Sequence, residues 1–172
     1  MHRSGWLKAA VAAAATASVF ALAACGQFTP DYLKPLSPKT RALLAEKGMT
    51  EESPILVRIF KAESELEVWK QKENGRFYHF KTYPICDWSG KLGPKQNQGD
   101  RQTPEGFYLV DEGQMNPKSK YHLAFNVGFP NAYDRSLGRS GGDIMVHGDC
   151  KSAGCFAMTD AVVEEIYILA RE

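Results

Sequence analysis

The residue types best suited to chemistry in this chain are a histidine and a cysteine, His147 and Cys155, which lie eight positions apart. A cysteine attacks a carbonyl carbon as its thiolate, whereas a free thiol, with a pKa of ~8.5, is mostly protonated at neutral pH. An imidazole beside the thiol can accept its proton and stabilise the resulting ion pair. The two residues therefore predict acyl transfer from an amide: His147 moves the proton, and Cys155 carries the acyl group as a thioester until an amine or water takes it.

Three small residues, Ser152, Ala153 and Gly154, lead directly into the cysteine. Such a segment can turn tightly, because Gly154 tolerates backbone angles that are closed to other residues. Successive N–H groups in the turn can then point at one oxygen atom. We expect Ser152, Ala153 and Gly154 to form an oxyanion hole and to contact the substrate.

Three other interpretations of this stretch compete with a catalytic pair. His147 and Cys155 can be ordinary packing residues. Together with Cys150 they also form an H-x2-C-x4-C arrangement similar to part of a zinc site, but a structural zinc ion normally has four ligands. The residues available as a fourth ligand are distant in the sequence: Cys86, His79 and His122. A redox pair of Cys150 with Cys155 lacks the C-x-x-C spacing of thiol oxidoreductases.

The elements that must position these residues are strands and loops. The apolar run over residues 144–146 predicts a strand that fixes the backbone before His147, and the polar, glycine-containing segment after it predicts a loop. Upstream, Asn74-Gly75 between two alternating apolar runs predicts a β-hairpin. The expected strands cover residues 55–60, 66–70, 76–83, 106–110, 121–127 and 143–146. The long segments 88–104 and 128–142 are expected to be loops, and long loops in compact domains are often functional.

Two helices are expected at the periphery of these strands. Ser37 followed by Pro38 is a typical helix start, so the sequence predicts a helix that begins there. A second helix is expected over residues 160–171, with Thr159 or Asp160 as its N-cap and apolar residues at helical spacing. The predicted fold is mostly β, of the α+β class, with peripheral helices.

The N-terminal segment predicts export. Two basic residues precede an apolar, alanine-rich run that is too short to span a bilayer comfortably, as in a signal peptide. The run ends in Leu-Ala-Ala before Cys25, which is typical of the site where bacterial lipoproteins are cleaved and lipidated. We therefore expect a lipoprotein signal over residues 1–25, lipidation of Cys25, a linker over residues 26–36 and one domain over residues 37–172. An ordinary cleaved signal and an uncleaved anchor helix are the alternatives.

Composition limits the classes of partner. The chain has 172 residues, 44% of them hydrophobic, which is enough for one domain with a core. The formal net charge is +1 and there is no basic stripe, so nucleic acid is not an expected partner. In an exported protein Cys86 and Cys150 can form a disulfide, and two free thiols are the alternative. The sequence ends at the predicted C-terminal helix, and truncation of a longer enzyme is one interpretation of that end.

Two sequence blocks in matching order resemble the L,D-transpeptidase catalytic domain (YkuD-type) family of bacterial cell-wall enzymes. The first block comprises residues 83–90 (YPICDWSG) and 100–108 (DRQTPEGFY). The second is residues 147–158 (HGDCKSAGCFAM), which contain the histidine and the cysteine. Details of both blocks are most similar to the YafK-like branch of the family, and the resemblance covers the chain from residue 54 to the C-terminus.

The resemblance implies an L,D-transpeptidase-like β-sandwich or barrel in which Cys155 is the nucleophile and His147 the proton donor and acceptor. It implies peptidoglycan stem peptides as substrates, opened at the L-to-D bond after meso-diaminopimelate, and a role in cell-wall biogenesis and cell shape. Transfer to an amine gives a crosslink or attaches a lipoprotein, whereas transfer to water trims stems or releases a wall-bound lipoprotein. No metal and no cofactor are implied. With the predicted signal, the expected location is the periplasm, with a membrane anchor through the lipid on Cys25.

The chain departs from the family pattern at two points. Many members carry an arginine two positions after the catalytic cysteine, where this chain has Ala157, and many have a longer loop between histidine and cysteine. Transferase and hydrolase therefore both stay open, and a non-catalytic wall-binding lipoprotein is the alternative from another class. Five basic residues of the long loops are candidates for binding stem-peptide carboxylates, or are solvated loop charges: Lys91, Lys95, Arg101, Arg135 and Arg139.

Overall fold

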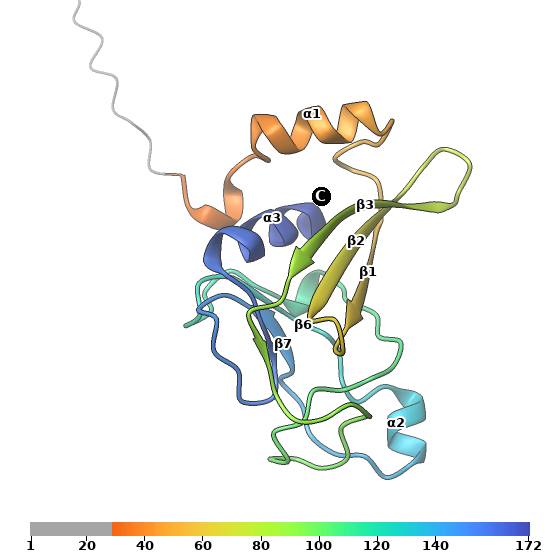
Figure 1. Ribbon diagram of the computed structural model, residues 1–172, viewed down its shortest axis with the longest axis vertical. Helices are drawn as coiled ribbons and strands as arrows, with labels where there is room; N and C mark the ends of the chain where they lie inside the picture. Colours follow the sequence, from red (N-terminus) through yellow and green to blue (C-terminus); the bar gives the residue numbers. More distant parts are fainter. Residues whose placement is uncertain (1–28) are drawn as a thin grey trace, which may run out of the picture.

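The computed structural model describes residues 29–172 (Figure 1). The predicted signal over residues 1–25, its lipidation site Cys25 and the first residues of the linker lie outside this range. None of the helices between residues 29 and 172 combines the length and the apolar character that a membrane span needs.

The first half of the fold is a three-stranded antiparallel sheet. Its strands β1 (Ile55–Phe60), β2 (Glu65–Gln71) and β3 (Phe77–Pro84) follow one another along the chain and pair in the order β1-β2-β3. The predicted hairpin turn joins β2 to β3, and Gly75 supplies the positive φ of 75° that this tight turn uses. Alternate residues of β2 are buried, as the period-two pattern of its sequence predicts.

A second, mixed sheet carries the candidate site. Its strands are short: β4 (Asp87–Trp88), β5 (Met115–Asn116), β6 (Ala124–Asn126), β7 (Met145–His147) and β8 (Phe156–Ala157). They lie in the order β4-β8-β7-β6-β5. Every neighbouring pair is antiparallel except β7 with β8, which is parallel.

Helices pack around the two sheets. They are α1 (Pro38–Glu46), α2 (Ala132–Ser136) and α3 (Asp160–Arg171), with the 3-10 helices η1 (Asp31–Leu33) and η2 (Glu112–Gln114). The predicted N-caps are confirmed, since Ser37 accepts a hydrogen bond from Thr40 N–H and Thr159 accepts one from Val162 N–H. Helix α2 was not predicted and lies inside the expected loop 128–142. Figure 1 shows α3 between α1 and the strands β6 and β7, and its apolar face is buried.

The core joins both sheets to α3. Its buried side chains include Phe80 and Tyr83 from β3, Phe125 from β6, Val146 from β7 and Ile166 from α3. One contiguous cluster of this kind is what a single domain of this size forms. The predicted fold class, mostly β within α+β and with peripheral helices, is confirmed.

Two of the predicted strands are corrected by the structure. The segment 106–110 forms no strand, and its residues Phe107 and Leu109 are 96% and 84% exposed. Its sequence alternates as a strand does, but no strand between residues 29 and 172 pairs with it, and a strand is stable only within a ladder. The strand predicted over 121–127 is reduced to β6, because His122 has a left-handed φ of 68° that an extended strand does not contain.

Candidate active site

The predicted base and nucleophile lie at the two parallel strands, on one face of the sheet. His147 ends β7 and Cys155 directly precedes β8, and the register pairs Val146 with Phe156 and His147 with Ala157. Side chains alternate between the faces of a sheet, so we infer that Cys155, in the bend two residues before Ala157, lies on the face of His147. Val146 and Phe156 point to the opposite face.

The imidazole of His147 is buried, and the backbone sets its tautomer. The residue is 3% exposed, and its Nδ1 lies 2.6 Å from the carbonyl oxygen of Gly148. A carbonyl oxygen can only accept a hydrogen bond, so Nδ1 carries the proton in this contact. Nε2 is then left with a lone pair, which a general base requires.

The thiol of Cys155 is partly buried and is held by the segment that leads into β7. Its Sγ accepts a hydrogen bond from Met145 N–H at 3.4 Å, and the thiol donates to the carbonyl oxygen of Asp143 at 3.7 Å. Burial raises the pKa of Cys155, the Asp143 carboxylate raises it further, and the Met145 N–H and the charge of Lys95 oppose the rise. The thiol therefore needs a base in order to react at neutral pH.

His147 and Cys155 are brought to one face without forming an ion pair. Within residues 29–172 the hydrogen bonds of Sγ are those to Met145 and Asp143, and His147 is bonded to the backbone. Rotation about the Cα–Cβ bond of Cys155 moves the sulfur between staggered positions and changes its neighbours. Such a resting arrangement is common in enzymes without substrate, whose catalytic hydrogen bonds tighten only in the complex.

The predicted oxyanion turn is built around the hydroxyl of Ser152. Its Oγ accepts hydrogen bonds from Gly154 N–H at 3.2 Å and from Cys155 N–H at 3.1 Å, and lies 2.8 Å from Ser89 Oγ. Gly154 has a φ of 133°, which the turn needs and which other residues rarely adopt. Ala153 is exposed, and within residues 29–172 its N–H has no hydrogen-bond partner. A substrate oxyanion therefore either displaces the Ser152 hydroxyl or uses the N–H of Ala153.

Cys86 and Cys150 form a disulfide, which was one of the two alternatives for these residues. The bond ties the loop between His147 and Cys155 to the segment between β3 and β4. Cys150 N–H also donates to the carbonyl oxygen of Met158 at 3.1 Å. A disulfide sulfur is not a thiolate ligand, so the zinc set with His147 and Cys155 and the redox pair of Cys150 with Cys155 are both wrong.

Three of the five basic loop residues bind groups of the protein itself and so stabilise the loops. Lys95 is buried and pairs with Asp100, and Arg139 pairs with the buried Asp134. Arg135 donates to a backbone carbonyl oxygen. Two of the candidates are exposed and form no ion pair with the described part of the chain: Lys91 and Arg101.

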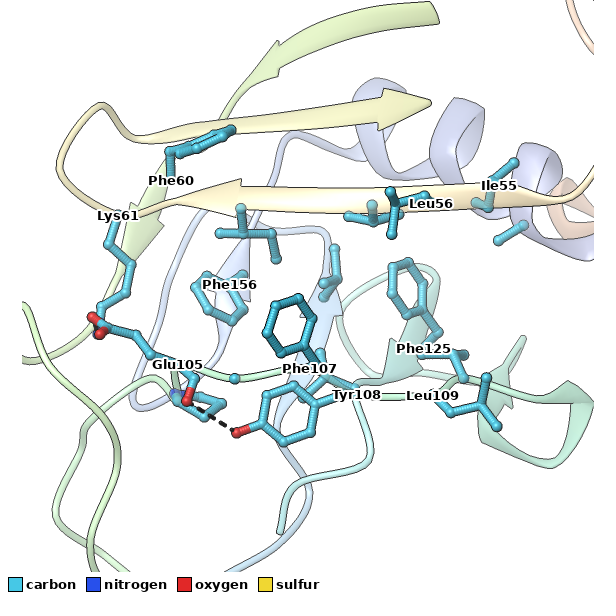
Figure 2. A pocket seen from close by; sticks show the side chains of 18 of the residues that line it. Ile55, Leu56, Phe60, Lys61, Glu105, Phe107, Tyr108, Leu109, Phe125 and Phe156 are labelled. Carbon is cyan, nitrogen blue, oxygen red and sulfur yellow. Dashed lines mark hydrogen bonds and ion pairs between the residues drawn. The ribbon is translucent and has the colours of Figure 1, made fainter. Parts of the chain in front are cut away.

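A large apolar cavity lies on the opposite face of the sheet from the candidate site. Its volume is about 710 Å³, and it lies between β1 and the segment 104–110. Figure 2 shows the rings of Phe107, Phe125 and Phe156 below β1 in this cavity. Its lining includes neither the predicted base nor the predicted nucleophile, so it is not the candidate reaction centre.

Two contacts at the site were missed by the sequence analysis. The carboxylate of Asp87 accepts a hydrogen bond from Ser152 N–H at 2.9 Å and so supports the turn. The ring of Tyr121 lies against the imidazole of His147, with centroids 4.8 Å apart. Asp87 lies within the upstream sequence block that resembles the family, and this position was the one indication in the sequence that it belongs to the site. No spacing links Tyr121 to His147, and the sequence analysis placed Tyr121 in a strand.

Comparison with known proteins identifies the family to which the chain belongs. A model of the L,D-transpeptidase catalytic domain matches residues 55–172, a range that contains His147, Cys155 and every strand described above. The chain is 49% identical over 115 residues to the candidate L,D-transpeptidase YafK of Escherichia coli K12, and equally to that of Escherichia coli O157:H7. These alignments cover 67% of this chain and 46% of each relative.

A solved structure has a similar fold. The helical cell shape determining protein Pgp2 of Campylobacter jejuni matches with a TM-score of 0.56 and 25% identity, over 77% of this chain and 52% of that chain. The chain therefore spans about half the length of the relatives it matches. The family match covers the two sheets and the residues of the site, and by that match the chain belongs to the L,D-transpeptidase catalytic domain family.

Proposed function

We propose that this protein is an L,D-transpeptidase that transfers acyl groups from peptidoglycan stem peptides through a thioester on Cys155. The observation that carries the proposal is the bond between His147 Nδ1–H and the Gly148 carbonyl, because it leaves Nε2 as a base on the sheet face that Cys155 shares. Membership of the family supports peptidoglycan stem peptides as the substrate class.

The first half-reaction forms the thioester. The thiol proton of Cys155 passes to Nε2 of His147, and Sγ bonds to the carbonyl carbon of the L-to-D amide. The resulting oxyanion takes hydrogen bonds from N–H groups of the turn 152–154. When the intermediate collapses, the C–N bond breaks, and the imidazolium of His147 returns the proton to the leaving amine.

The second half-reaction decides between transferase and hydrolase. An acceptor loses a proton to His147 and attacks the thioester, and Cys155 regains its proton as the acyl group leaves. An amine acceptor gives a crosslink between stems, whereas water gives an L,D-endopeptidase that trims stems or releases a wall-bound lipoprotein. Ala157 keeps hydrolysis as the second candidate, since it is fully buried and offers no charged side chain to an acceptor where many members of the family have arginine.

The cell envelope is the compartment that fits this chemistry. The disulfide between Cys86 and Cys150 supports it, because such bonds persist in oxidising compartments outside the cytosol. The periplasmic location, the lipid anchor on Cys25 and a wall-linked lipoprotein as partner stay predictions from the sequence.

The test is mass spectrometry of purified wall fragments with tetrapeptide stems after incubation with the full-length protein. The expected result for the wild type is a covalent acyl adduct on Cys155, together with a new crosslink or a shortened stem. Cys155→Ala should abolish adduct and product, and His147→Ala should slow adduct formation. Ser53→Ala, in the loop that precedes β1, is the matched control and should behave as the wild type.

The mass of the product separates the candidates. A crosslinked dimer supports the transferase, and a shortened stem or a released peptide supports the hydrolase. Binding to wall material by a folded wild-type protein, with neither adduct nor product, would favour the non-catalytic lipoprotein. Undiminished turnover by Cys155→Ala would sink the proposal.

A further inference from the structure

The ring of Tyr121 covers the candidate base. The ring centroids of Tyr121 and His147 are 4.8 Å apart, and their planes are inclined by 33°. His147 is almost completely buried, whereas Tyr121 keeps 48% of its surface exposed. Tyr121 therefore lies between the imidazole and solvent, at a separation typical of interacting aromatic rings.

The backbone around Gly148 brings the two rings together. Gly148 directly follows His147 in the chain, and its N–H donates a hydrogen bond to the carbonyl oxygen of Tyr121 at 2.9 Å. A Cβ on Gly148 would meet the Asp160 carboxylate and would lie 2.9 Å from that same Tyr121 oxygen, so a larger residue would displace both. Gly148 thus fixes the imidazole through its own carbonyl and the tyrosine through its N–H.

The segment of Tyr121 is also anchored on α3. The next residue, His122, has a left-handed φ of 68°, and its Nε2 lies 2.6 Å from a carboxylate oxygen of Glu164. Leu123 follows and is buried in the core. The hydrogen bonds that Tyr121 makes within residues 29–172 are those of its backbone, to Ser119 and Gly148. It is therefore the ring, and not the hydroxyl, that contacts the site.

We propose that Tyr121 is a positioning residue of this enzyme, whose ring holds the imidazole of His147 in the orientation set by the Gly148 carbonyl and keeps solvent from its covered face. The inference rests on the proposed role of His147 as the base. The hydrogen bond at Nδ1 is a single contact about which the imidazole can pivot, and the ring of Tyr121 packed against it restricts that motion. An imidazole held in this way presents Nε2 to the thiol of Cys155 more often than a free one does.

The test measures Cys155 directly and needs no wall substrate. The rate of alkylation by iodoacetamide at pH 7 reports how well His147 takes the thiol proton. Tyr121→Leu should lower this rate about fivefold, because an aromatic pair contributes on the order of 1 kcal/mol. Tyr121→Phe keeps the ring and should restore the wild-type rate. In turnover of wall fragments, Tyr121→Leu should lower kcat by a similar factor with KM unchanged.

Two further variants separate positioning from general damage. Tyr78→Leu removes another partly exposed tyrosine, on β3, and should leave the alkylation rate and kcat unchanged. Glu164→Ala releases the anchor on His122 and should lower the rate by a smaller factor than Tyr121→Leu. A wild-type rate in Tyr121→Leu, a Tyr121→Phe as slow as Tyr121→Leu, or an equal loss in Tyr78→Leu would overturn the inference. The alkylation result stands apart from the proposed function, which fails if wall fragments give no product or if Cys155→Ala turns them over as fast as the wild type.

Discussion

Removal of the disulfide between Cys86 and Cys150 is expected to destabilise the domain and slow the reaction. The bond closes a loop of 64 residues and restricts the unfolded chain. The chain-entropy relation gives an entropy term of about 14 cal/mol/K for such a loop, hence about 4 kcal/mol at 25 °C. In a domain of this size, the same loss lowers the melting temperature by roughly 10–15 °C.

The assay is urea unfolding at 25 °C of the oxidised wild type and of the double variant Cys86→Ala/Cys150→Ala. Both cysteines are replaced together, so that neither can pair with Cys155, the remaining free thiol of the described residues. The wild type reduced with a phosphine carries no substitution and is the matched control, and it should lose a similar free energy of unfolding. Cys150 also lies in the loop before Cys155, so kcat should fall at temperatures where both proteins are folded.

The reasoning can be refuted in two ways. A loss below about 1 kcal/mol, with mass spectrometry showing an oxidised wild type, would mean that the bond does not restrict the unfolded chain as the entropy relation requires. An unchanged kcat in a folded double variant would mean that the bond plays no part in holding the loop between His147 and Cys155.

Three further predictions concern the site and the neighbouring loop. In His147→Ala, the alkylation rate of Cys155 should rise with pH, because the thiolate then forms without the help of a base. The midpoint of this pH profile should lie above the ~8.5 of an ordinary thiol, since burial raises the pKa of Cys155. A midpoint below that value would contradict the prediction. Ser152→Ala removes the acceptor of two N–H groups and should lower the free energy of unfolding by about 1–2 kcal/mol, with a lower kcat; wild-type values of both would count against it. Asp100→Asn leaves the buried Lys95 without its carboxylate and should cost about 3 kcal/mol in urea unfolding at pH 7. Burial raises the pKa of Asp100, but hydrogen bonds from Lys95 and three backbone N–H groups lower it more, so the folded pKa lies below the unfolded one. The stabilisation is thus present above about pH 4 and is lost as the pH falls, and a cost for Asp100→Asn that does not shrink below pH 4 would contradict it.

Local signals account for the parts of the fold that were predicted correctly. The hairpin between β2 and β3 follows from Asn74-Gly75, since the turn needs a positive φ that Gly75 adopts. The helix starts follow from Ser37 and Thr159, whose hydroxyls accept backbone N–H groups three residues on. Each of these features is decided by a few consecutive residues, so the sequence is sufficient to predict them.

Features that depend on distant partners were not predictable in the same way. The segment 106–110 has a strand-like sequence, yet it lacks a pairing strand within the described chain. The pairing of Cys86 with Cys150 joins residues 64 positions apart, and composition left it open. The contact of Tyr121 with His147 depends on the antiparallel pairing of β6 with β7, which brings Ala124 opposite His147. No pattern within either segment encodes that register.

The placement of His147 at the end of β7 and of Cys155 directly before β8 depends on an uncommon connection. Parallel strands usually need a crossover of about a dozen residues or more. Here β7 ends at His147 and β8 begins at Phe156, so the crossover is the segment 148–155, without a helix. The number of positions between His147 and Cys155 in the sequence is therefore set by the length of this crossover. A longer insertion here would leave the strands in place but would change the turn that presents Cys155.

So short a crossover requires backbone conformations that most residues avoid, and the surrounding contacts must hold them. Asp149 and Cys150 have left-handed φ values of 69° and 49°, and for residues other than glycine each costs about 1–2 kcal/mol. Asp149 N–H donates to the carboxylate of Asp160 at the start of α3, and Cys150 is bonded covalently to Cys86. The disulfide therefore acts on one of these two residues, in the loop that leads to the turn before Cys155. We therefore expect it to hold the loop between His147 and Cys155 in place as well as to restrict the unfolded chain.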